Sequence, residues 1–347
     1  MTKETKVNLI PSLTWGYEKV NYQLIDLEDF DFKNSTFEIA NKVPKDFHDN
    51  FNSINYGVSQ EILNLNKELR NYENFYSFNG NEKVEKTINL DFDNNYISDL
   101  YGIEVKEGAN ATLLLDYRSD KNVKAYKNTV IKIKGNKNSK LKIIIIQRLS
   151  HLSKAFFSMV SDLDENANVD LVHIEIGSKE SYANYVANIR GEKADSNIRT
   201  AYFLNDERKL DLGYLINHIG KSTTSDMVVN GVLKDFSKKR FICTLNFLRN
   251  CTYSKGNEEE FVTLLDPTVK NITVPLLLAR EHDIEGNHAA SVGRVDQEML
   301  FYIRSRGFDE LAAKKIIIES KVKPVLDLIE HDDIAKEIMD EILESID

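Results

Sequence analysis

The 347-residue chain has few of the residues that define several protein classes. Its two cysteines, Cys243 and Cys251, are too few for a disulfide framework or for a zinc site built from CxxC pairs. Fifteen glycines and five prolines exclude collagen-like and low-complexity chains. The longest apolar runs, at 143–146 and 275–279, are far too short to cross a bilayer, so a membrane-spanning class is excluded as well.

The chain also lacks a basic excess. Its 45 Lys and Arg residues are outnumbered by 55 Asp and Glu residues, and the formal charge of −10 argues against a general nucleic-acid binder. The first ten residues carry charge but no apolar stretch typical of a signal peptide. With so few cysteines, these features predict a soluble protein of a reducing, cytoplasmic setting, without nucleic-acid or membrane partners.

Between about residues 96 and 280, the sequence has the pattern of successive β-strands separated by turns. Alternating or β-branched stretches occupy 111–117, 129–134 and 169–176. Clusters of turn-forming residues begin at 107, 135, 164, 191 and 220, in steps of 28, 29, 27 and 29 residues. A mainly β protein with a β-solenoid core explains this repeat, because each unit buries its apolar face on its neighbours. A sandwich or a barrel is the alternative.

Helical patterns flank the β region. Residues 60–72 place apolar side chains at helical spacing, and from about 295 the chain returns to this period. Asp296 is a good N-cap, Gly307 stands where a helix C-cap is expected, and Asp309 can cap a helix over 310–322. Pro324 then predicts a break and a restart.

The last stretch forms an amphipathic stripe that needs a partner surface, in this chain or in another, with apolar residues at 334, 338, 342 and 343. These textures divide the chain into a mixed helical region at 1–95, a β-helix core at 96–294 and a C-terminal helical region at 295–347.

Motifs of common enzyme classes are missing. The sequence has no GxxxxGK[ST], GxGxxG, HExxH or GxSxG, so any ATP involved must be bound by another chain. The acidic clusters at 162–165 and 257–260 are expected to be solvated turn residues. His173 and His218 are expected to be hydrogen-bonded structural residues.

Two remaining features point weakly to metal chemistry. His282 and His288 lie six residues apart around a turn, and imidazole suits iron if a partner supplies further ligands. Cys243 and Cys251 are expected to be buried as small apolar residues, although a redox or ligand role stays open for them.

Several segments carry a more specific signal: 218–225 followed by 230–235, and 275–279 followed by 287–296 and 300–307. In order and spacing they resemble the SufB/SufD family, the scaffold subunits of the SUF iron–sulfur cluster assembly machinery. The resemblance is specific from about 210 to 320 and rests on architecture from 96 to 210. It implies a right-handed parallel β-helix with helical N-terminal and C-terminal segments.

Within this family the chain looks most like SufD. Phe261 stands where SufB-like chains carry a cysteine before a Leu-Leu segment, and Ala289 replaces the Glu that SufB favours after the histidine. The resemblance makes His288 a candidate metal ligand at the interface with SufB. Many SufD chains have a cysteine two residues earlier, where this chain has Gly286.

The resemblance implies a non-enzymatic scaffold that pairs with a SufB-like subunit and binds the ABC-type ATPase SufC, which would hydrolyse the ATP. It implies no firmly bound cofactor, only transient iron or an iron–sulfur cluster at the SufB interface. The expected ATPase-binding residues are Phe301, Tyr302, Arg304, Arg306 and Gly307. Two alternatives remain: a β-helix carbohydrate-active enzyme, and a homodimeric interaction module.

Overall fold

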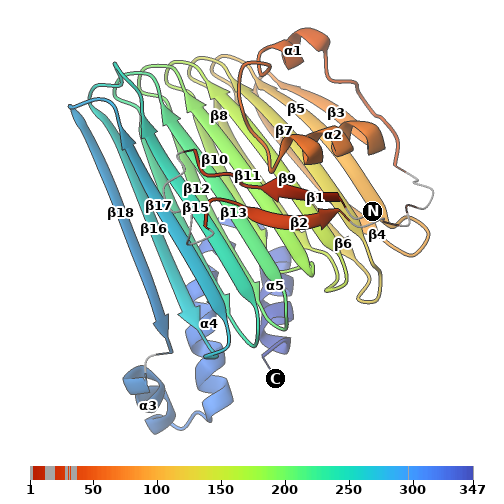
Figure 1. Ribbon diagram of the computed structural model, residues 1–347, viewed down its shortest axis with the longest axis vertical. Helices are drawn as coiled ribbons and strands as arrows, with labels where there is room; N and C mark the ends of the chain where they lie inside the picture. Colours follow the sequence, from red (N-terminus) through yellow and green to blue (C-terminus); the bar gives the residue numbers. More distant parts are fainter. Residues whose placement is uncertain are drawn as a thin grey trace.

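In the computed structural model, the centre of the chain is a parallel β-helix made of two sheets (Figure 1). The structure describes residues 3–11, 20–27, 30, 32, 37–295 and 297–346, and the predicted N-cap Asp296 lies outside them. The odd-numbered sheet contains β3 (Tyr72–Phe78), β5 (Tyr96–Val105), β7 (Tyr126–Gly135), β9 (Lys154–Leu163), β11 (Glu180–Ile189), β13 (Lys209–His218), β15 (Lys238–Phe247) and β17 (Lys270–Ala279). The even-numbered sheet contains β4 (Asn81–Leu90), β6 (Asn110–Ser119), β8 (Lys140–Arg148), β10 (Asn168–Glu175), β12 (Asp195–Leu204), β14 (Thr224–Leu233), β16 (Ser254–Leu264) and β18 (Ile284–Arg294).

The chain crosses from one sheet to the other after every strand, so each coil adds one strand to each sheet. Lys140 pairs in parallel register with Asn168, and Asn168 pairs with Asp195. These partners are one coil apart, which confirms the solenoid predicted from the turn spacing. Asn138 and Asn166 occupy equivalent turns with φ of 58°, a left-handed conformation that asparagine tolerates better than most residues.

Side chains that point between the sheets form one continuous core. Because strand residues alternate between two faces, partners in register stack on the same face. One such column on the even-numbered sheet is apolar and buried over five coils, and it consists of Leu113, Ile143, Leu171, Ile198 and Met227. The space between the sheets, called the lumen below, is therefore filled by side chains along most of its length.

The N-terminal region covers the outer face of the odd-numbered sheet (Figure 1). It contains the antiparallel pair β1 (Lys3–Val7) and β2 (Gln23–Leu27), followed by α1 (Lys45–Asp49) and α2 (Gln60–Leu69). Helix α2 confirms the helix expected at 60–72 as far as Leu69, while Tyr72 already begins β3. Its Ile62 packs in a cluster with residues of β7, β9 and β11. Asn8 donates hydrogen bonds to the carbonyl of Ala183 at 3.0 Å and to Asp211 at 2.6 Å, which fixes this region to the sheet.

The C-terminal helices lie on the other side, against the even-numbered sheet (Figure 1). They are α3 (Gln297–Ser305), α4 (Glu310–Leu326), the 3₁₀ turn η1 (Asp327–Ile329) and α5 (Asp332–Glu344). Asp309 caps α4 as predicted, accepting a hydrogen bond from the amide of Ala312 at 2.7 Å. Ile338 and Ile342 of α5 are buried in a cluster with strand residues, so the amphipathic helix has its partner surface within this chain.

Two boundaries differ from the sequence expectations. The helix predicted to break at Pro324 continues to Leu326, because Val325 and Leu326 are buried against the sheet and stabilise a last turn that lacks one hydrogen bond. The sheets begin at Tyr72 rather than near residue 96, since β3 and β4 already form a coil. No helix in the described parts of the chain is long and apolar enough to span a membrane.

Candidate functional site at the open end of the solenoid

The last coil leaves one end of the solenoid open. Within the described residues, β17 pairs with β15 alone and β18 pairs with β16 alone. Each strand therefore has one side whose backbone N–H and C=O groups meet no further strand, and β18 forms the free edge in Figure 1. Such edges are templates for pairing with another chain.

The open end exposes apolar side chains that belong to the lumen. Leu277 of β17 is in register with the buried Leu245, and Val292 of β18 is in register with the buried Val262. In the last coil, however, Leu277 is 41% exposed and Val292 is 45% exposed. Apolar lumen side chains that are exposed in this way are expected to be covered by another surface.

The apolar column described above ends in two polar residues at this end. Met227 is in register with Glu258 of β16, and Glu258 is in register with His288 of β18. Both side chains therefore lie on the lumen face of the sheet. Glu258 is almost fully buried, whereas His288 on the edge strand is exposed.

Three charged side chains are buried together beneath the open end. Lys239 forms an ion pair with Glu260, which also accepts a hydrogen bond from the Thr273 hydroxyl. Burial raises the pKa of Glu258 to about 7, and the neighbouring Glu260 adds to this shift while Lys239 opposes it. The carboxylates also affect Cys243, whose thiol pKa is raised by burial and then by Glu258 and Glu260.

The sequence interpretation of these acids was wrong. The cluster at 257–260 was expected to be a solvated turn, but it lies inside β16, where Glu258 and Glu260 point into the lumen. The missed signal was alternation: residues 254–264 alternate between buried and more accessible positions over most of the strand. The ion pair with Lys239, 21 residues away, has no local sequence signature.

The structure separates the residues that the sequence grouped near His288. His282 lies before β18, outside the strand that carries His288, and Phe261 is exposed on the outer face of β16. A Cβ added to Gly286 would lie 2.7 Å from Leu277 Cδ1, so a cysteine here would require Leu277 to move. Among the described residues, no group of three or more His, Cys, Asp and Glu side chains could hold a metal ion.

The two thiols and two further imidazoles, those of His173 and His218, are buried. Cys243 and Cys251 are both free and buried, as expected for small apolar residues. The His173 imidazole lies 2.8 Å from the Tyr214 hydroxyl and 2.9 Å from Glu175. His218 is buried between Thr223 and Ser225, and burial lowers its pKa to about 4.

A second candidate surface lies on α3, at the foot of the open end (Figure 1). Phe301 is 75% exposed and Tyr302 is 57% exposed, while Leu300 packs inward against α4. The Arg306 guanidinium stacks over the Tyr302 ring at 5.0 Å and donates a hydrogen bond to its hydroxyl at 2.8 Å. Arg304 is also exposed, and Gly307 ends the helix with a φ of 99°. The five residues expected to bind the ATPase are thus adjacent and accessible.

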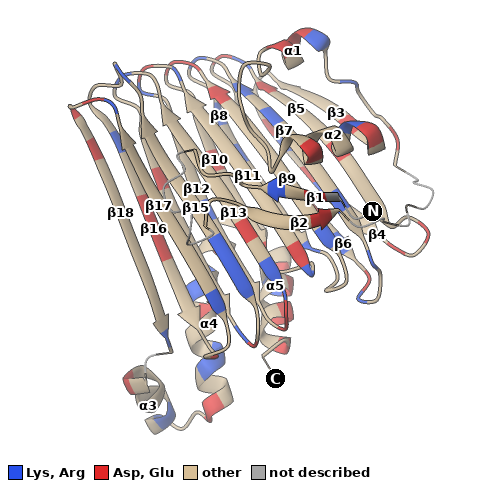
Figure 2. Cartoon of the chain, viewed as in Figure 1, with Lys and Arg blue, Asp and Glu red and all other residues tan. Residues whose placement is uncertain are grey.

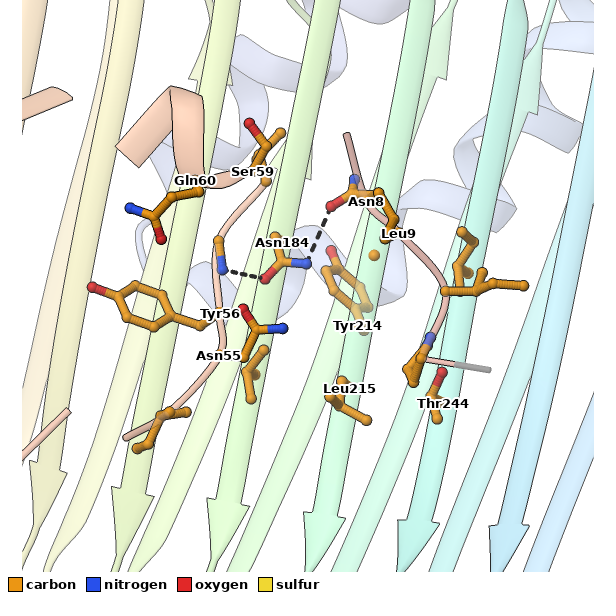
Figure 3. A pocket seen from close by; sticks show the side chains of 18 of the residues that line it. Asn8, Leu9, Asn55, Tyr56, Ser59, Gln60, Asn184, Tyr214, Leu215 and Thr244 are labelled. Carbon is orange, nitrogen blue, oxygen red and sulfur yellow. Dashed lines mark hydrogen bonds between the residues drawn. The ribbon is translucent and has the colours of Figure 1, made fainter. Parts of the chain in front are cut away.

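A cavity of about 970 Å³ lies between the N-terminal region and the outer face of the odd-numbered sheet (Figure 3). Its amide side chains bond to one another and to the backbone: Asn184 donates to Asn8 at 3.1 Å and accepts from the Gly57 amide at 2.9 Å. These contacts hold the N-terminal region in place.

The comparisons with known proteins agree on one family. Residues 91–321 match the family model described as the SUF system FeS cluster assembly, SufBD core domain. An iron–sulfur cluster assembly SufBD family protein of Mycobacterium tuberculosis is 24% identical over 246 residues, which are 70% of this chain and 28% of that protein. The SufD protein of Bacillus subtilis is 26% identical over 152 residues, 44% of this chain and 35% of its own. A SufBD family protein of Staphylococcus epidermidis is 26% identical over 199 residues, which are 57% of this chain and 42% of that protein. The aligned part of this chain thus spans less than half the length of these relatives.

Proposed function

Because the chain belongs to the SufBD family of iron–sulfur cluster assembly proteins, we propose that it is a SufD-like scaffold subunit. It pairs with a SufB-like subunit through the open end of its solenoid and binds a SufC-type ABC ATPase through its C-terminal helices. The ATP is hydrolysed by that ATPase, and this chain contributes surfaces rather than catalysis. The observation that carries the proposal is the uncapped last coil, with two free strand edges and exposed lumen residues.

The residues at this end support a SufD-like rather than a SufB-like role. Phe261, at the position of the SufB thiol, cannot ligate iron and faces outward from β16. A SufB-like partner therefore has to supply the thiolate, and this chain offers the imidazole of His288 at the edge of the same end. Iron or a nascent cluster is the cargo at this interface, held only transiently.

The surface on α3 supports ATPase binding. An aromatic pair with most of its area in water is costly for a free protein, and aromatic residues together with Arg are enriched at the centres of protein interfaces. The Arg306–Tyr302 stack holds both side chains in place before a partner arrives.

A tagged copy of the chain, recovered from its own cells with its partners identified by mass spectrometry, tests this function. The wild-type chain should recover an ABC-type ATPase and a cysteine-bearing relative. Val292→Asp should lose the relative and keep the ATPase, because a carboxylate in the last coil opposes coverage of the lumen. Phe301→Asp should have the opposite effect.

Leu152→Asp provides the control, because Leu152 is an exposed apolar residue in the turn between β8 and β9. This turn is far in sequence from the open end and from α3, so the variant should keep both partners. Recovery of neither partner by the wild-type chain would contradict the proposal. Recovery of a second copy of the chain alone would indicate a homodimeric module instead.

A further inference from the structure

The buried charges at the open end do not balance. Glu260 is satisfied by Lys239 and Thr273, but the Oε1 atom of Glu258 is buried without a hydrogen-bond partner. A carboxylate removed from water without a partner is strongly unfavourable, so such a group requires an explanation. Beneath the open end, two carboxylates share one ammonium group, which leaves the site with an excess of negative charge when both are ionised.

The position of Glu258 suggests what the missing partner is. His288 follows Glu258 in the same lumen column, and neighbouring strands in a sheet are about 4.8 Å apart. The remainder of the column, from Leu113 to Met227, is apolar. From Leu113 to His288, the polar residues of this column are therefore Glu258, which is buried on β16, and His288, which is exposed on the edge strand β18.

We propose that Glu258 and His288 form a two-donor half-site for a ferrous ion at the mouth of the lumen, completed by ligands from the subunit that covers this end. This inference rests on the proposed function and adds Glu258 to the single imidazole expected there. A carboxylate combined with imidazole is a donor set that suits non-haem Fe(II). The ion is cargo on its way to a cluster, so two donors from this chain allow it to be held and released.

The arrangement separates the roles of the two residues. His288 is exposed on the edge strand and can meet the ion first. Glu258 lies one strand deeper, buried beside the carboxylate of Glu260 on the same face of β16, where an added positive charge is favoured. The ammonium group of Lys239, which pairs with Glu260 on the same strand as Glu258, repels a cation and so limits how far it can enter the lumen.

Anaerobic Fe(II) binding to the chain in complex with its recovered partner tests the half-site. Glu258→Gln removes the charge with little change in shape, and we expect a loss of affinity of at least about tenfold, similar to that of His288→Gln. Glu258→Asp, which keeps a carboxylate, should retain part of the affinity. Glu259→Gln is the control, because Glu259 is the next residue on the same strand and faces the outer side of the sheet.

Binding of Mn(II) followed by electron paramagnetic resonance gives a second measurement that does not depend on cluster assembly. Nitrogen coupling from an imidazole should be present in the wild-type complex and absent in His288→Gln. Unchanged Fe(II) affinity of Glu258→Gln, in a complex that still contains its partner, would overturn the half-site and leave the scaffold function standing. Loss of the partner from the wild-type preparation would instead contradict the proposed function. Full binding by Glu258→Gln with weaker partner association would show that Glu258 receives a basic side chain of the partner.

Discussion

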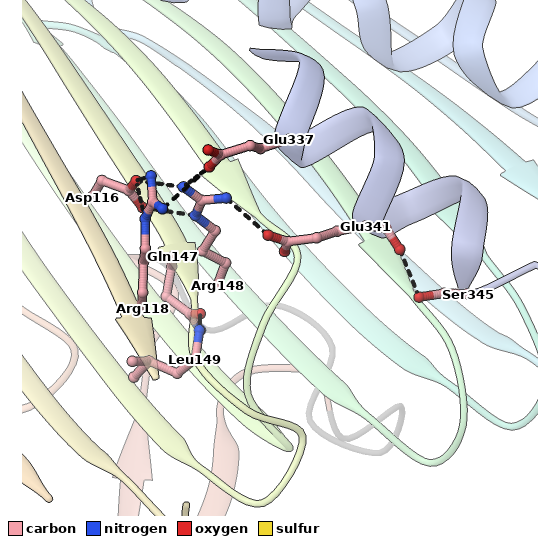
Figure 4. Close-up of polar contacts among 8 residues, drawn as sticks. All are labelled: Asp116, Arg118, Gln147, Arg148, Leu149, Glu337, Glu341 and Ser345. Atoms are coloured by element: carbon pink, nitrogen blue, oxygen red, sulfur yellow. Dashed lines mark hydrogen bonds and ion pairs between the residues drawn. The ribbon is translucent and has the colours of Figure 1, made fainter. Parts of the chain in front are cut away.

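Arg148 of β8 connects helix α5 to the even-numbered sheet, and its replacement tests the reasoning about buried charge (Figure 4). Its side chain is 3% exposed and bonds to the fully buried Asp116 through Nη2 at 2.7 Å and Nε at 2.9 Å. The same guanidinium reaches Glu337 at 2.9 Å and Glu341 at 2.8 Å, both on α5. Arg148→Met keeps the apolar stem and removes the charge.

The structure allows the cost to be estimated. Removing one partner of a buried ion pair typically costs about 3–5 kcal/mol when the other charge loses its partner. Arg118 also contacts Asp116, at 2.6 Å, so the carboxylate keeps one cation and we expect about 3 kcal/mol. Glu337 and Glu341 are about half exposed, so water replaces the lost contacts there and they add no more than about 1 kcal/mol.

Urea unfolding followed by circular dichroism measures this loss, and hydrogen exchange of α5 shows whether the helix opens first. Arg118→Met is the control, because Arg118 is more exposed and should cost about 1 kcal/mol or less. Asp116→Asn combined with Arg148→Met should cost less than the sum of the single changes, since the pair is removed together. The reasoning is refuted if Arg148→Met lies within about 0.5 kcal/mol of the wild type.

Two further predictions concern the lumen. The depressed pKa of His218, about 4 against 6.5 in the unfolded chain, means that the unfolded state takes up a proton first as the pH falls. The free energy of unfolding should therefore decrease by up to about 3 kcal/mol as the pH falls from 6.5 to 4. His218→Gln should flatten the plot of urea midpoint against pH over this range. An unchanged slope in this variant would assign the acid sensitivity to other groups. Gly231→Ala would place a Cβ 1.8 Å from the ring of the fully buried Tyr202, so it should destabilise the protein by about 3 kcal/mol or more. A Cβ at Gly293 meets nothing within 4 Å, so Gly293→Ala should leave the stability unchanged. Equal urea-unfolding midpoints for the two variants would contradict the packing argument.

The sequence predicted the solenoid because the turns that interrupt it are chemically distinct and evenly spaced. It predicted the C-terminal helices because Asp309 and Gly307 mark their ends locally. The first coil was missed because β4 carries a charge at four of its first six positions, which obscures the strand pattern. Local sequence signals therefore predict the period of the coils better than their number.

The candidate site was less accessible to sequence reasoning. His288 could be singled out by resemblance, but its relation to Glu258 depends on strand register across a whole coil. The acidic run around Glu258 has the composition of a surface turn, and only the alternation along β16 shows that two of its three carboxylates are buried. Pairing across a coil is set by turn length, which a single sequence does not determine to one residue.

The opposite end of the solenoid is built differently. Its edge strand, β4, carries exposed Glu82, Lys83 and Glu85, with an ion pair of 2.6 Å between the last two. Lys86 lies over the Tyr72 ring at 5.0 Å and donates a hydrogen bond to its hydroxyl. Charged side chains on an edge strand oppose pairing with another chain, so this end resists association.

The contrast between the ends restricts the assemblies that the chain can form. β18 carries no Asp, Glu, Lys or Arg between Glu285 and Arg294, and in Figure 2 it is tan along most of its length. If each first coil could accept a last coil, solenoids would join head to tail into open filaments. With the β4 end charged, association between two open ends is favoured over head-to-tail joining, and such a contact would close after two solenoids. A closed pair also brings two lumen mouths together, so each subunit can supply ligands that the other lacks.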